Sequence, residues 1–345
     1  MPRRALSSTR RTLLAFALAA LLGAACVVVA LAFDGNGAPA STGPPPARGS
    51  VTGEWRALSP APLERTEVAA ARVGRFVYVV GGFEARTGET VGALERYDIR
   101  ANRWKRLRPM PVGANHATAA AYRGRLYVHG GYTARRDLTS ATRRLYSFDP
   151  KRNRWRRLPD SREDRAAHAM AVLDGRLYAA GGRNETADLT SMEVYDFARR
   201  RWRPGPSFRG PRRDHMTGVA SGGFFYALAG REGERLYRVA ERYDPRRRRW
   251  QRLPPMRRAR AGIASAALSG GRVVVFGGED FGTGNTISEV ELYDPKRRRW
   301  RSLPDMRTPR HGLGGVSLRD RVYAIQGGPQ PGFHFSSTLE FIDVR

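Results

Sequence analysis

Apolar and β-branched residues occur along most of the chain in short runs that turn residues separate. Runs such as RFVYVVGG and RLYAAGG are bounded by Gly, Arg-Gly or Asp-Gly, which favour turns. This pattern predicts many short β-strands. Segment 12–33 differs, because it is uncharged throughout and about as long as the roughly 20 residues that span a bilayer.

Three markers recur together along the chain, about 49 residues apart. The first is a tryptophan, found at Trp55, Trp104, Trp155, Trp202, Trp250 and Trp300. The second is a strand that ends in glycine, at Gly81, Gly82, Gly130, Gly131, Gly181, Gly182, Gly230, Gly277, Gly278, Gly327 and Gly328. The third is an aspartate that follows an aromatic residue and precedes a tryptophan, at Asp98, Asp149, Asp196, Asp244 and Asp294.

These markers, with the pattern W..LP.M at Trp250 and Trp300, resemble the kelch repeat over residues 53–345. The resemblance implies an all-β fold, a β-propeller with one four-stranded blade per repeat. Glycine allows a sharp turn where a side chain would meet a neighbouring blade, and tryptophan offers a large surface for packing between blades.

The number of blades follows from the two ends of the repeat region. GEWRALSPAP contains a tryptophan strand with no blade before it, and the last repeat ends before its own tryptophan strand. We therefore predict a six-bladed kelch-type propeller in which the N-terminal strand completes the last blade.

The N-terminal segment predicts export. Four arginines precede the apolar run and resemble, in TRRTLL, a twin-arginine signal: Arg3, Arg4, Arg10 and Arg11. Residues 1–33 then act as an export signal or membrane anchor, either retained through residues 13–33 or cleaved near Ala32. Lipidation at Cys26 fits less well, because Gly23 stands where a larger apolar residue is usual. Residues 34–52 read as a Pro/Gly/Ser linker, and the propeller is expected to be extracytoplasmic.

Composition limits the chemistry. Cys26 is the one cysteine, so residues 53–345 offer no disulfide, no CxxC zinc pair and no thiol nucleophile. The copper radical oxidases of the kelch type are excluded, because their cofactor resembles a tyrosine cross-linked to a cysteine. We predict no cofactor. A metal site from His116, His168 and His215 is disfavoured, since these residues come from three repeats without an evident acidic second shell.

The net charge of +29 comes mainly from arginines in the predicted turns between the third and fourth strands. One interpretation is a set of solvated turns. The other is contact with an anionic membrane or envelope polymer, at about 1 kcal/mol per cation near the surface. The candidates are Arg246, Arg247, Arg248, Arg249, Arg297, Arg298 and Arg299. Nucleic acid is not expected, because no exposed aromatic residues interleave the clusters.

The opposite face carries longer loops and recurrent arginine and histidine residues near the inner strands. Candidate ligand-binding residues there are Arg165, His168, Arg183, His215, Arg260 and Arg310. The alternative is that this Arg/His position belongs to the repeat itself and hydrogen-bonds neighbouring blades.

Two functions remain open. The first is a non-catalytic module that binds a protein or a glycan. The second is an enzyme similar to the bacterial kelch proteins that interconvert sialic acid anomers. That resemblance implies a carbohydrate mutarotase, with Glu185, Glu279 or Asp280 as the proton-transfer group and Arg165, Arg183 or Arg310 as a carboxylate clamp.

Overall fold

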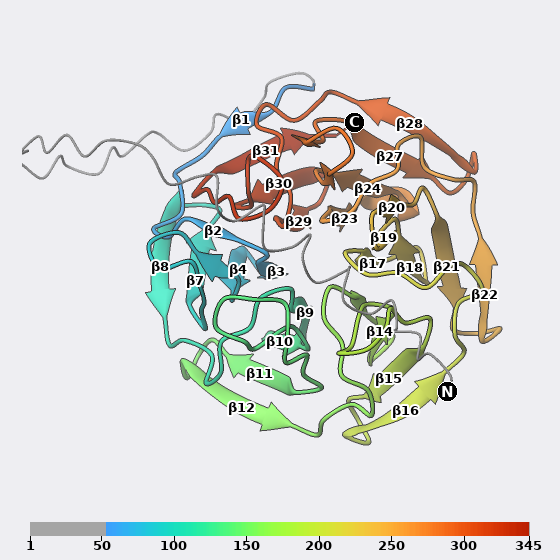
Figure 1. The fold of residues 1–345 in the computed structure, drawn as a ribbon, viewed down its shortest axis with the longest axis horizontal. Helices are drawn as coiled ribbons and strands as arrows, with labels where there is room; N and C mark the ends of the chain where they lie inside the picture. The colour runs from blue at the N-terminus through green and yellow to red at the C-terminus, as the bar shows by residue number, and fades with distance from the viewer. Residues whose placement is uncertain (1–52, 345) are drawn as a thin grey trace, which may run out of the picture. The chain divides into compact units, whose positions relative to one another are not determined.

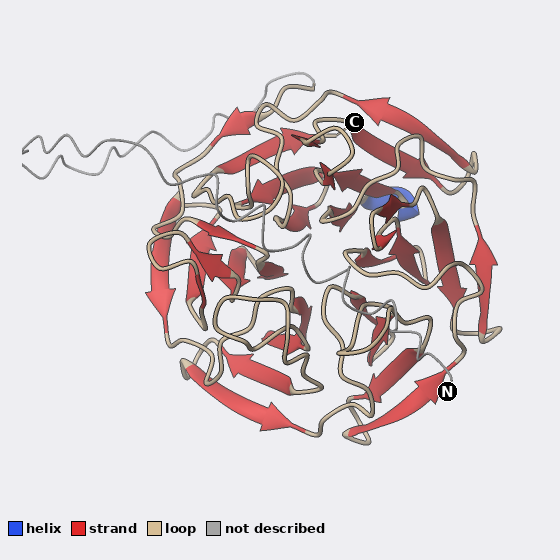
Figure 2. Ribbon diagram, viewed as in Figure 1, coloured by secondary structure: helices blue, strands red, loops and turns tan. Residues whose placement is uncertain are grey.

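The computed structural model describes residues 53–344, which form a ring of six four-stranded antiparallel sheets (Figure 1). Figure 2 shows strands and loops throughout this ring, with one 3-10 turn at Ser269–Gly271. Strands run outward from the centre of the ring in the order a, b, c, d within each blade. The predicted six-bladed propeller is confirmed.

The first three blades follow one another in chain order. Blade 1 comprises β3 (Ala69–Val73), β4 (Phe76–Val80), β7 (Leu94–Asp98) and β8 (Arg103–Leu107). Blade 2 comprises β9 (Thr118–Tyr122), β10 (Arg125–His129), β11 (Leu145–Asp149) and β12 (Arg154–Leu158). Blade 3 comprises β13 (Ala169–Leu173), β14 (Arg176–Ala180), β15 (Met192–Asp196) and β16 (Arg201–Gly205).

The remaining blades complete the ring. Blade 4 comprises β17 (Thr217–Ser221), β18 (Phe224–Leu228), β21 (Ala240–Asp244) and β22 (Arg249–Arg252). Blade 5 comprises β23 (Ala264–Ala267), β24 (Val273–Phe276), β27 (Val290–Asp294) and β28 (Arg299–Leu303). Blade 6 comprises β29 (Gly314–Leu318), β30 (Arg321–Ile325), β31 (Leu339–Asp343) and β1 (Arg56–Ala57).

Short strands also form in the loops between the b and c strands and before the first inner strand, on one face of the ring. They are β2 (Arg65–Thr66), β5 (Phe83–Glu84), β6 (Glu89–Thr90), β19 (Arg231–Glu232), β20 (Arg235–Leu236), β25 (Glu279–Asp280) and β26 (Asn285–Thr286). The ring closes where β1 pairs with β31, Arg56 opposite Phe341. In Figure 1 the blue β1 lies beside the red β31, so the N-terminal strand completes the last blade as predicted.

A ring of main-chain hydrogen bonds links each blade to the next. The N–H after the b strand donates to a carbonyl just before the next inner strand, at 2.9–3.0 Å, in the pairs Gly82–Ala114, Gly131–Arg165, Gly182–Arg213, Gly230–Arg260, Gly278–Arg310 and Gly327–Arg65. A Cβ on Gly82 would lie 2.4 Å from the carbonyl oxygen of Thr66. Glycine is therefore required by the close approach of two backbones.

In blade 6 the predicted position of the glycine pair, Gly327–Gly328, was wrong by one residue. Its b strand ends at Ile325, so Gln326 and Gly327 occupy the positions that the glycine pair occupies elsewhere, and Gln326 takes a left-handed φ of 54°. Gly328 has another purpose, because a Cβ there would lie 2.4 Å from His311 Cε1.

A second ring of bonds joins the blades at their periphery. Each tryptophan indole N–H donates to a main-chain carbonyl of the preceding blade at 2.7–3.1 Å, in the pairs Trp55–Pro304, Trp104–Ser59, Trp155–Arg108, Trp202–Pro159, Trp250–Pro206 and Trp300–Pro254. The Trp55 bond spans the two ends of the propeller, so the closure repeats the contacts of the other five junctions.

The residue whose carbonyl accepts the indole hydrogen bond also influences which residue stands two positions before the tryptophan. Ser59 and Arg108 have an N–H, and it donates to the side chains of Asn102 and Asn153 at 3.0 Å. The other four accepting residues are prolines, which have no N–H, and the facing residues there are Gly53, Arg200, Arg248 and Arg298. Three of these four positions are arginines, and an asparagine there would lack the main-chain donor that Asn102 and Asn153 use.

Five blades contain a fully buried arginine paired with a glutamate of the c strand at 2.9–3.2 Å: Arg65–Glu95, Arg165–Glu193, Arg213–Glu241, Arg260–Glu291 and Arg310–Glu340. The guanidinium groups also donate to carbonyls at the end of the b strand, as Arg65 does to Gly81 at 2.7 Å. Blade 2 has Ala114 and Tyr146 at these two positions, so both partners are replaced together. A buried charge without its partner is strongly destabilising, which explains the joint replacement.

The outer strands explain much of the arginine excess. Every blade presents the free edge of its d strand, and in blades 1 to 5 exposed cations occupy it, for example Arg103, Lys105 and Arg106 on β8 and Arg154, Arg156 and Arg157 on β12. Charged side chains on an exposed edge prevent pairing with another sheet. Cations therefore protect the edges as well as filling the predicted turns.

The pairing of Arg213 with Glu241 predicts the outcome of a double-mutant cycle. Glu241→Tyr alone leaves a buried guanidinium without its counter-charge and should cost about 3–5 kcal/mol of unfolding free energy. The double variant Arg213→Ala, Glu241→Tyr reproduces the blade 2 pair and should be more stable than Glu241→Tyr alone. Urea unfolding measures both. A double variant that is less stable than Glu241→Tyr would contradict the pairing argument.

Candidate functional site

The mouth of the central channel is encircled by a third ring of main-chain bonds. The residue two positions before each inner strand has a left-handed φ of 47–66°, at Glu67, His116, Ala167, His215, Gly262 and Gly312. Neighbouring blades are joined here at 2.8–3.3 Å by the N–H to carbonyl pairs His116–Glu67, Ala167–His116, Met216–Ala167, Gly262–His215, Gly312–Gly262 and Val68–Gly312. The ring fixes these six residues around one opening.

Three of the six positions carry polar side chains although glycine would suit the backbone better. Blades 5 and 6 use Gly262 and Gly312, whereas blades 1, 2 and 4 use Glu67, His116 and His215. A left-handed conformation costs a residue with a side chain on the order of 1 kcal/mol or more. Strain of this kind gathers where a side chain has a function, so the three residues mark a candidate site.

The three side chains meet. His116 Nε2 lies 3.1 Å from Glu67 Oε2 and 3.0 Å from His215 Nε2. A Cβ on Gly312 would lie 2.5 Å from Glu67 Oε1, so the glycine of blade 6 leaves the space that this carboxylate occupies. The strained residues and the glycine opposite them thus form one arrangement, which we call the mouth cluster.

Four further residues complete the mouth cluster. Arg231 donates to His215 Nε2 at 3.1 Å and lies 3.7 Å from both Glu279 and Asp214. His311 Nε2 lies 3.5 Å from Glu67 and 3.6 Å from Glu279. Asp214 Oδ1 is 3.0 Å from His215 Nδ1, although without hydrogen-bond geometry. Two carboxylates, those of Asp214 and Glu279, therefore flank the guanidinium of Arg231.

Burial controls the protonation of the mouth cluster. Desolvation lowers the pKa of His116 well below its usual value, so its imidazole is neutral. Desolvation also raises the pKa of Glu67, although His311 and His215 oppose this. Burial alone would raise the pKa of Asp214, but His215 and Arg231 hold it below the usual value. Glu67 is thus more easily protonated than Asp214.

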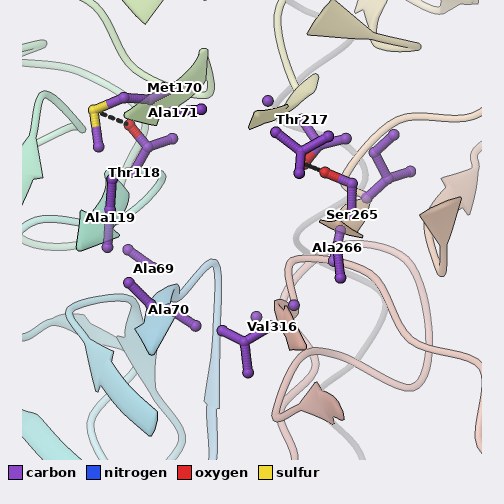
Figure 3. Close-up of a pocket in the computed structure, with 18 of the residues that line it drawn as sticks. Ala69, Ala70, Thr118, Ala119, Met170, Ala171, Thr217, Ser265, Ala266 and Val316 are labelled. Atoms are coloured by element: carbon purple, nitrogen blue, oxygen red, sulfur yellow. Dashed lines mark hydrogen bonds between the residues drawn. The ribbon is translucent and has the colours of Figure 1, made fainter. Parts of the chain in front are cut away.

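The central channel runs inward from the mouth between the inner strands. It encloses about 380 Å³ and is lined mostly by alanine, glycine, serine and threonine. Figure 3 shows small side chains such as Ala69, Ala119 and Ala266 around it, with Thr217 and Ser265 hydrogen-bonded at 2.9 Å. Most of the channel wall carries no ionisable side chain, so the groups that could bind or react with a ligand lie mainly at the mouth.

A smaller cavity of about 70 Å³ lies over the mouth cluster, with Glu67, His116, His215, Arg231, Glu279 and His311 among its lining residues. Its apolar lining comes from Phe83, Leu138, Phe281 and Phe333. Leu138, Phe281 and Phe333 are 41%, 47% and 53% exposed and are the exposed large hydrophobic residues of the described chain. They come from loops of blades 2, 5 and 6, yet all line this cavity. Apolar walls with a few converging polar groups are typical of ligand sites.

The structure places the predicted ligand-binding residues in three settings. Arg165, Arg260 and Arg310 have no exposed surface and pair with glutamates inside their blades. His168 is buried beside His129 and Thr118, at 3.1 and 2.7 Å. Arg183 pairs with Asp188 at 3.0 Å and is partly exposed. Of these six residues, His215 alone lies in the mouth cluster.

The predicted catalytic and basic residues are also separated. Glu279 is buried in the mouth cluster, whereas Glu185 is exposed and accepts a hydrogen bond from the Ala141 N–H. Asp280 lies 3.7 Å from Arg258. The basic candidates are all exposed, in two turns and at the first residue of the strand after each: Arg246, Arg247, Arg248, Arg249, Arg297, Arg298 and Arg299.

Sequence reasoning missed Glu67, Arg231, Phe281 and Phe333. Aligning the six repeats two residues before the inner strand would have found Glu67, because Glu, His, His, Ala and two glycines share that position. Within residues 53–344, no three histidine or acidic side chains are grouped so as to hold a metal ion, and no helix is long and apolar enough to span a membrane.

Comparison with known families now identifies the fold. The family described as the KLHDC2/KLHL20/DRC7 Kelch-repeats domain matches residues 67–263, and the Kelch motif matches residues 264–307. The chain belongs to the kelch-repeat family. A solved structure titled "Structure of YjhT" superimposes with a TM-score of 0.73 at 17% identity, over 84% of this chain and 97% of that one. At this identity the likeness concerns the fold.

Curated kelch proteins match parts of the chain. Human Kelch-like protein 26 is 40% identical over 85 residues, or 25% of this chain and 14% of that protein. Alpha-scruin of Limulus polyphemus is 34% identical over 91 residues, or 26% and 10%. Kelch-like protein 41a of Danio rerio is 23% identical over 176 residues, or 51% and 29%. The matched region is therefore less than a third of each relative's length.

The strain at the kelch mouth predicts a gain of stability when glycine is introduced. Ala167→Gly relieves only the left-handed backbone and should raise the unfolding free energy by about 0.5–1 kcal/mol. Glu67→Gly also removes a desolvated carboxyl group and should raise it at least as much. Urea unfolding at pH 7 measures both. A Glu67→Gly protein less stable than the wild type would show that Glu67 supports the fold instead of a ligand.

Proposed function

We propose that the protein is an exported kelch propeller that binds a protein ligand on the face carrying the mouth cluster. The observation that carries this proposal is the convergence of Leu138, Phe281 and Phe333 over one cavity. Exposed apolar residues that gather over a cavity are a common mark of an interaction site. Kelch propellers are a protein-binding type of module, which agrees with this choice.

Export rests on the sequence of residues 1–33, which lie outside the described residues. We propose that this segment anchors the protein or is cleaved, so that the propeller acts outside the cytoplasm. The mouth face would then be available to a ligand in the envelope or beyond it.

A sugar mutarotase is the second candidate, and one observation supports it. Glu279 and Glu67 are carboxyl groups beneath a cavity, beside a neutral histidine, as general acid–base catalysis requires. Against it, the clamp candidates Arg165 and Arg310 are fully buried, and the guanidinium of Arg231 is already surrounded by carboxylates. A binding module accounts for the apolar rim as well, and we prefer it.

Selected peptides test this proposal directly. Peptides enriched from a random library by the full-length protein should bind the double variant Phe281→Ser, Phe333→Ser at least about tenfold more weakly, because central aromatic residues dominate binding energy. Fluorescence polarisation measures the affinities. The matched control replaces Arg246–Arg249 by glutamine on the opposite face and should bind as the wild type does.

Two outcomes would contradict the proposal. Peptides that bind the phenylalanine variant unchanged would place the site elsewhere, and peptides lost only in the arginine variant would place it on the basic face. The wild type should also leave sialic acid anomer exchange, followed by NMR, at its rate in buffer. Acceleration that disappears in Glu279→Gln would favour the mutarotase.

A further inference from the structure

The cavity over the mouth cluster presents hydrogen-bond acceptors more than donors. The His116 Nδ1 proton is committed to Asn115 Oδ1 at 2.6 Å, because the amide nitrogen of Asn115 donates to Thr90. His116 Nε2 therefore carries a lone pair. His215 Nε2 accepts from Arg231, since a guanidinium has no acceptor atom. The His116 Nε2 lone pair thus has no donor and lies 3.1 Å from the Glu67 carboxyl group and 3.0 Å from His215 Nε2, whose own lone pair accepts from Arg231.

A proton on Glu67 does not resolve this crowding. It can satisfy the contact between Glu67 and His116 Nε2, but the two imidazole nitrogens still face each other at 3.0 Å. Another acceptor nearby is also unused, because the Thr66 hydroxyl lines the same cavity, is 1% exposed and has no hydrogen-bond partner. Buried polar atoms without partners are rare and call for an explanation.

The carboxyl groups around the cavity also favour a hydrogen-bond donor or a positive charge, as the unpaired acceptors do. The carboxyl groups of Glu67 and Glu279 line the cavity, and Arg231, the guanidinium in the same lining, is already flanked by Glu279 and Asp214. His116 does not compensate, since burial keeps it neutral. This acidic mouth lies in a chain with a net charge of +29. The contrast favours a cationic group in the cavity over an anionic one.

Aromatic faces complete the environment of a cation. The rings of Phe83 and Phe333 lie 4.8 Å apart, and the guanidinium of Arg231 already lies 5.1 Å from the centre of the Phe281 ring. Arg231 shows within the molecule that these carboxylates and this ring together hold a cation. Aromatic rings with nearby carboxylates are the usual receptors of ammonium groups.

We propose that the mouth cavity binds an organic cation, an ammonium group on a short alkyl frame such as the lysine side chain of a bound protein. This proposal rests on the proposed function, because it names the group by which the protein ligand is anchored. The ammonium group donates to the carboxylates of Glu67 and Glu279 and to the hydroxyl oxygen of Thr66, and its alkyl carbons pack on Phe281 and Phe333. The cavity volume of about 70 Å³ suits one cationic head group and is too small for several side chains of a ligand.

Proton release should accompany binding. Glu67 faces His116, His215 and His311, the Glu279 carboxylate and the Arg231 guanidinium, and its pKa is raised by burial. A bound cation favours the ionised carboxylate and lowers that pKa again. Binding therefore releases protons wherever Glu67 is protonated in the free protein, and affinity rises with pH over that range.

n-Butylammonium, a lysine side-chain analogue, and the uncharged 1-butanol provide the test. Isothermal titration of the full-length protein, with EDTA present to exclude metal ions, should show n-butylammonium binding at least about tenfold more tightly than 1-butanol. Titrations at two pH values and in two buffers of different ionisation enthalpy should show tighter binding and less proton release at the higher pH. Equal or tighter binding of 1-butanol would overturn the proposal, as would no n-butylammonium binding up to about 50 mM.

Variants locate the site. Glu279→Gln and Phe281→Ala should each weaken n-butylammonium binding at least about fivefold, and the matched control Glu185→Gln, an exposed carboxylate on the same face, should not. Binding of n-butylammonium that survives both cavity variants would also overturn the proposal. Peptides that require Phe281 and Phe333 but show no preference for a cation would refute this inference and leave the proposed function standing. Binding of n-butylammonium without any selected peptide would do the reverse.

Discussion

The structure depends on close main-chain contact between neighbouring blades around the centre of the ring. Six N–H groups that follow the b strands donate to the next blade, and six more bonds encircle the mouth. Both sets include the junction between the last blade and the first, through Gly327–Arg65 and Val68–Gly312. A backbone contact of this kind tolerates almost any side chain that points away from it, so the mouth can vary its chemistry while its geometry stays fixed.

The mouth cluster uses this freedom. Glu67, His116 and His215 occupy left-handed positions where Gly262 and Gly312 show the relaxed solution. The two rings of main-chain hydrogen bonds and the buried arginine–glutamate pairs hold these strained residues in place. A rigid scaffold that holds strained, desolvated polar groups beneath an apolar rim is preorganised for binding, because little ordering remains when the ligand arrives.

Sequence patterns predict what the repeats share, and the site lies in what they do not share. Six evenly spaced tryptophans were enough for the number of blades and for the role of β1. The register of blade 6 was missed by one residue, because Gly327–Gly328 resembles the glycine pair while Gln326–Gly327 fills its place. Arg165, Arg260 and Arg310 were predicted to bind a ligand because they recur in the repeats. They recur because each forms a buried ion pair with a glutamate inside its own blade. Phe281 and Phe333 lie in loops without a pattern, and only the fold brings them over Glu67.

Native-state hydrogen exchange tests the central claim, that closure of the ring fixes the mouth. The amide protons of Val68 and Gly327 complete the two inner rings across the junction of the first and last blades. The account predicts that both exchange only through global unfolding, with the same opening free energy as Gly131 and Gly182 inside the ring. If Val68 or Gly327 exchanged through local opening several kcal/mol below the global value, the junction would be loose and the mouth would not be held by closure.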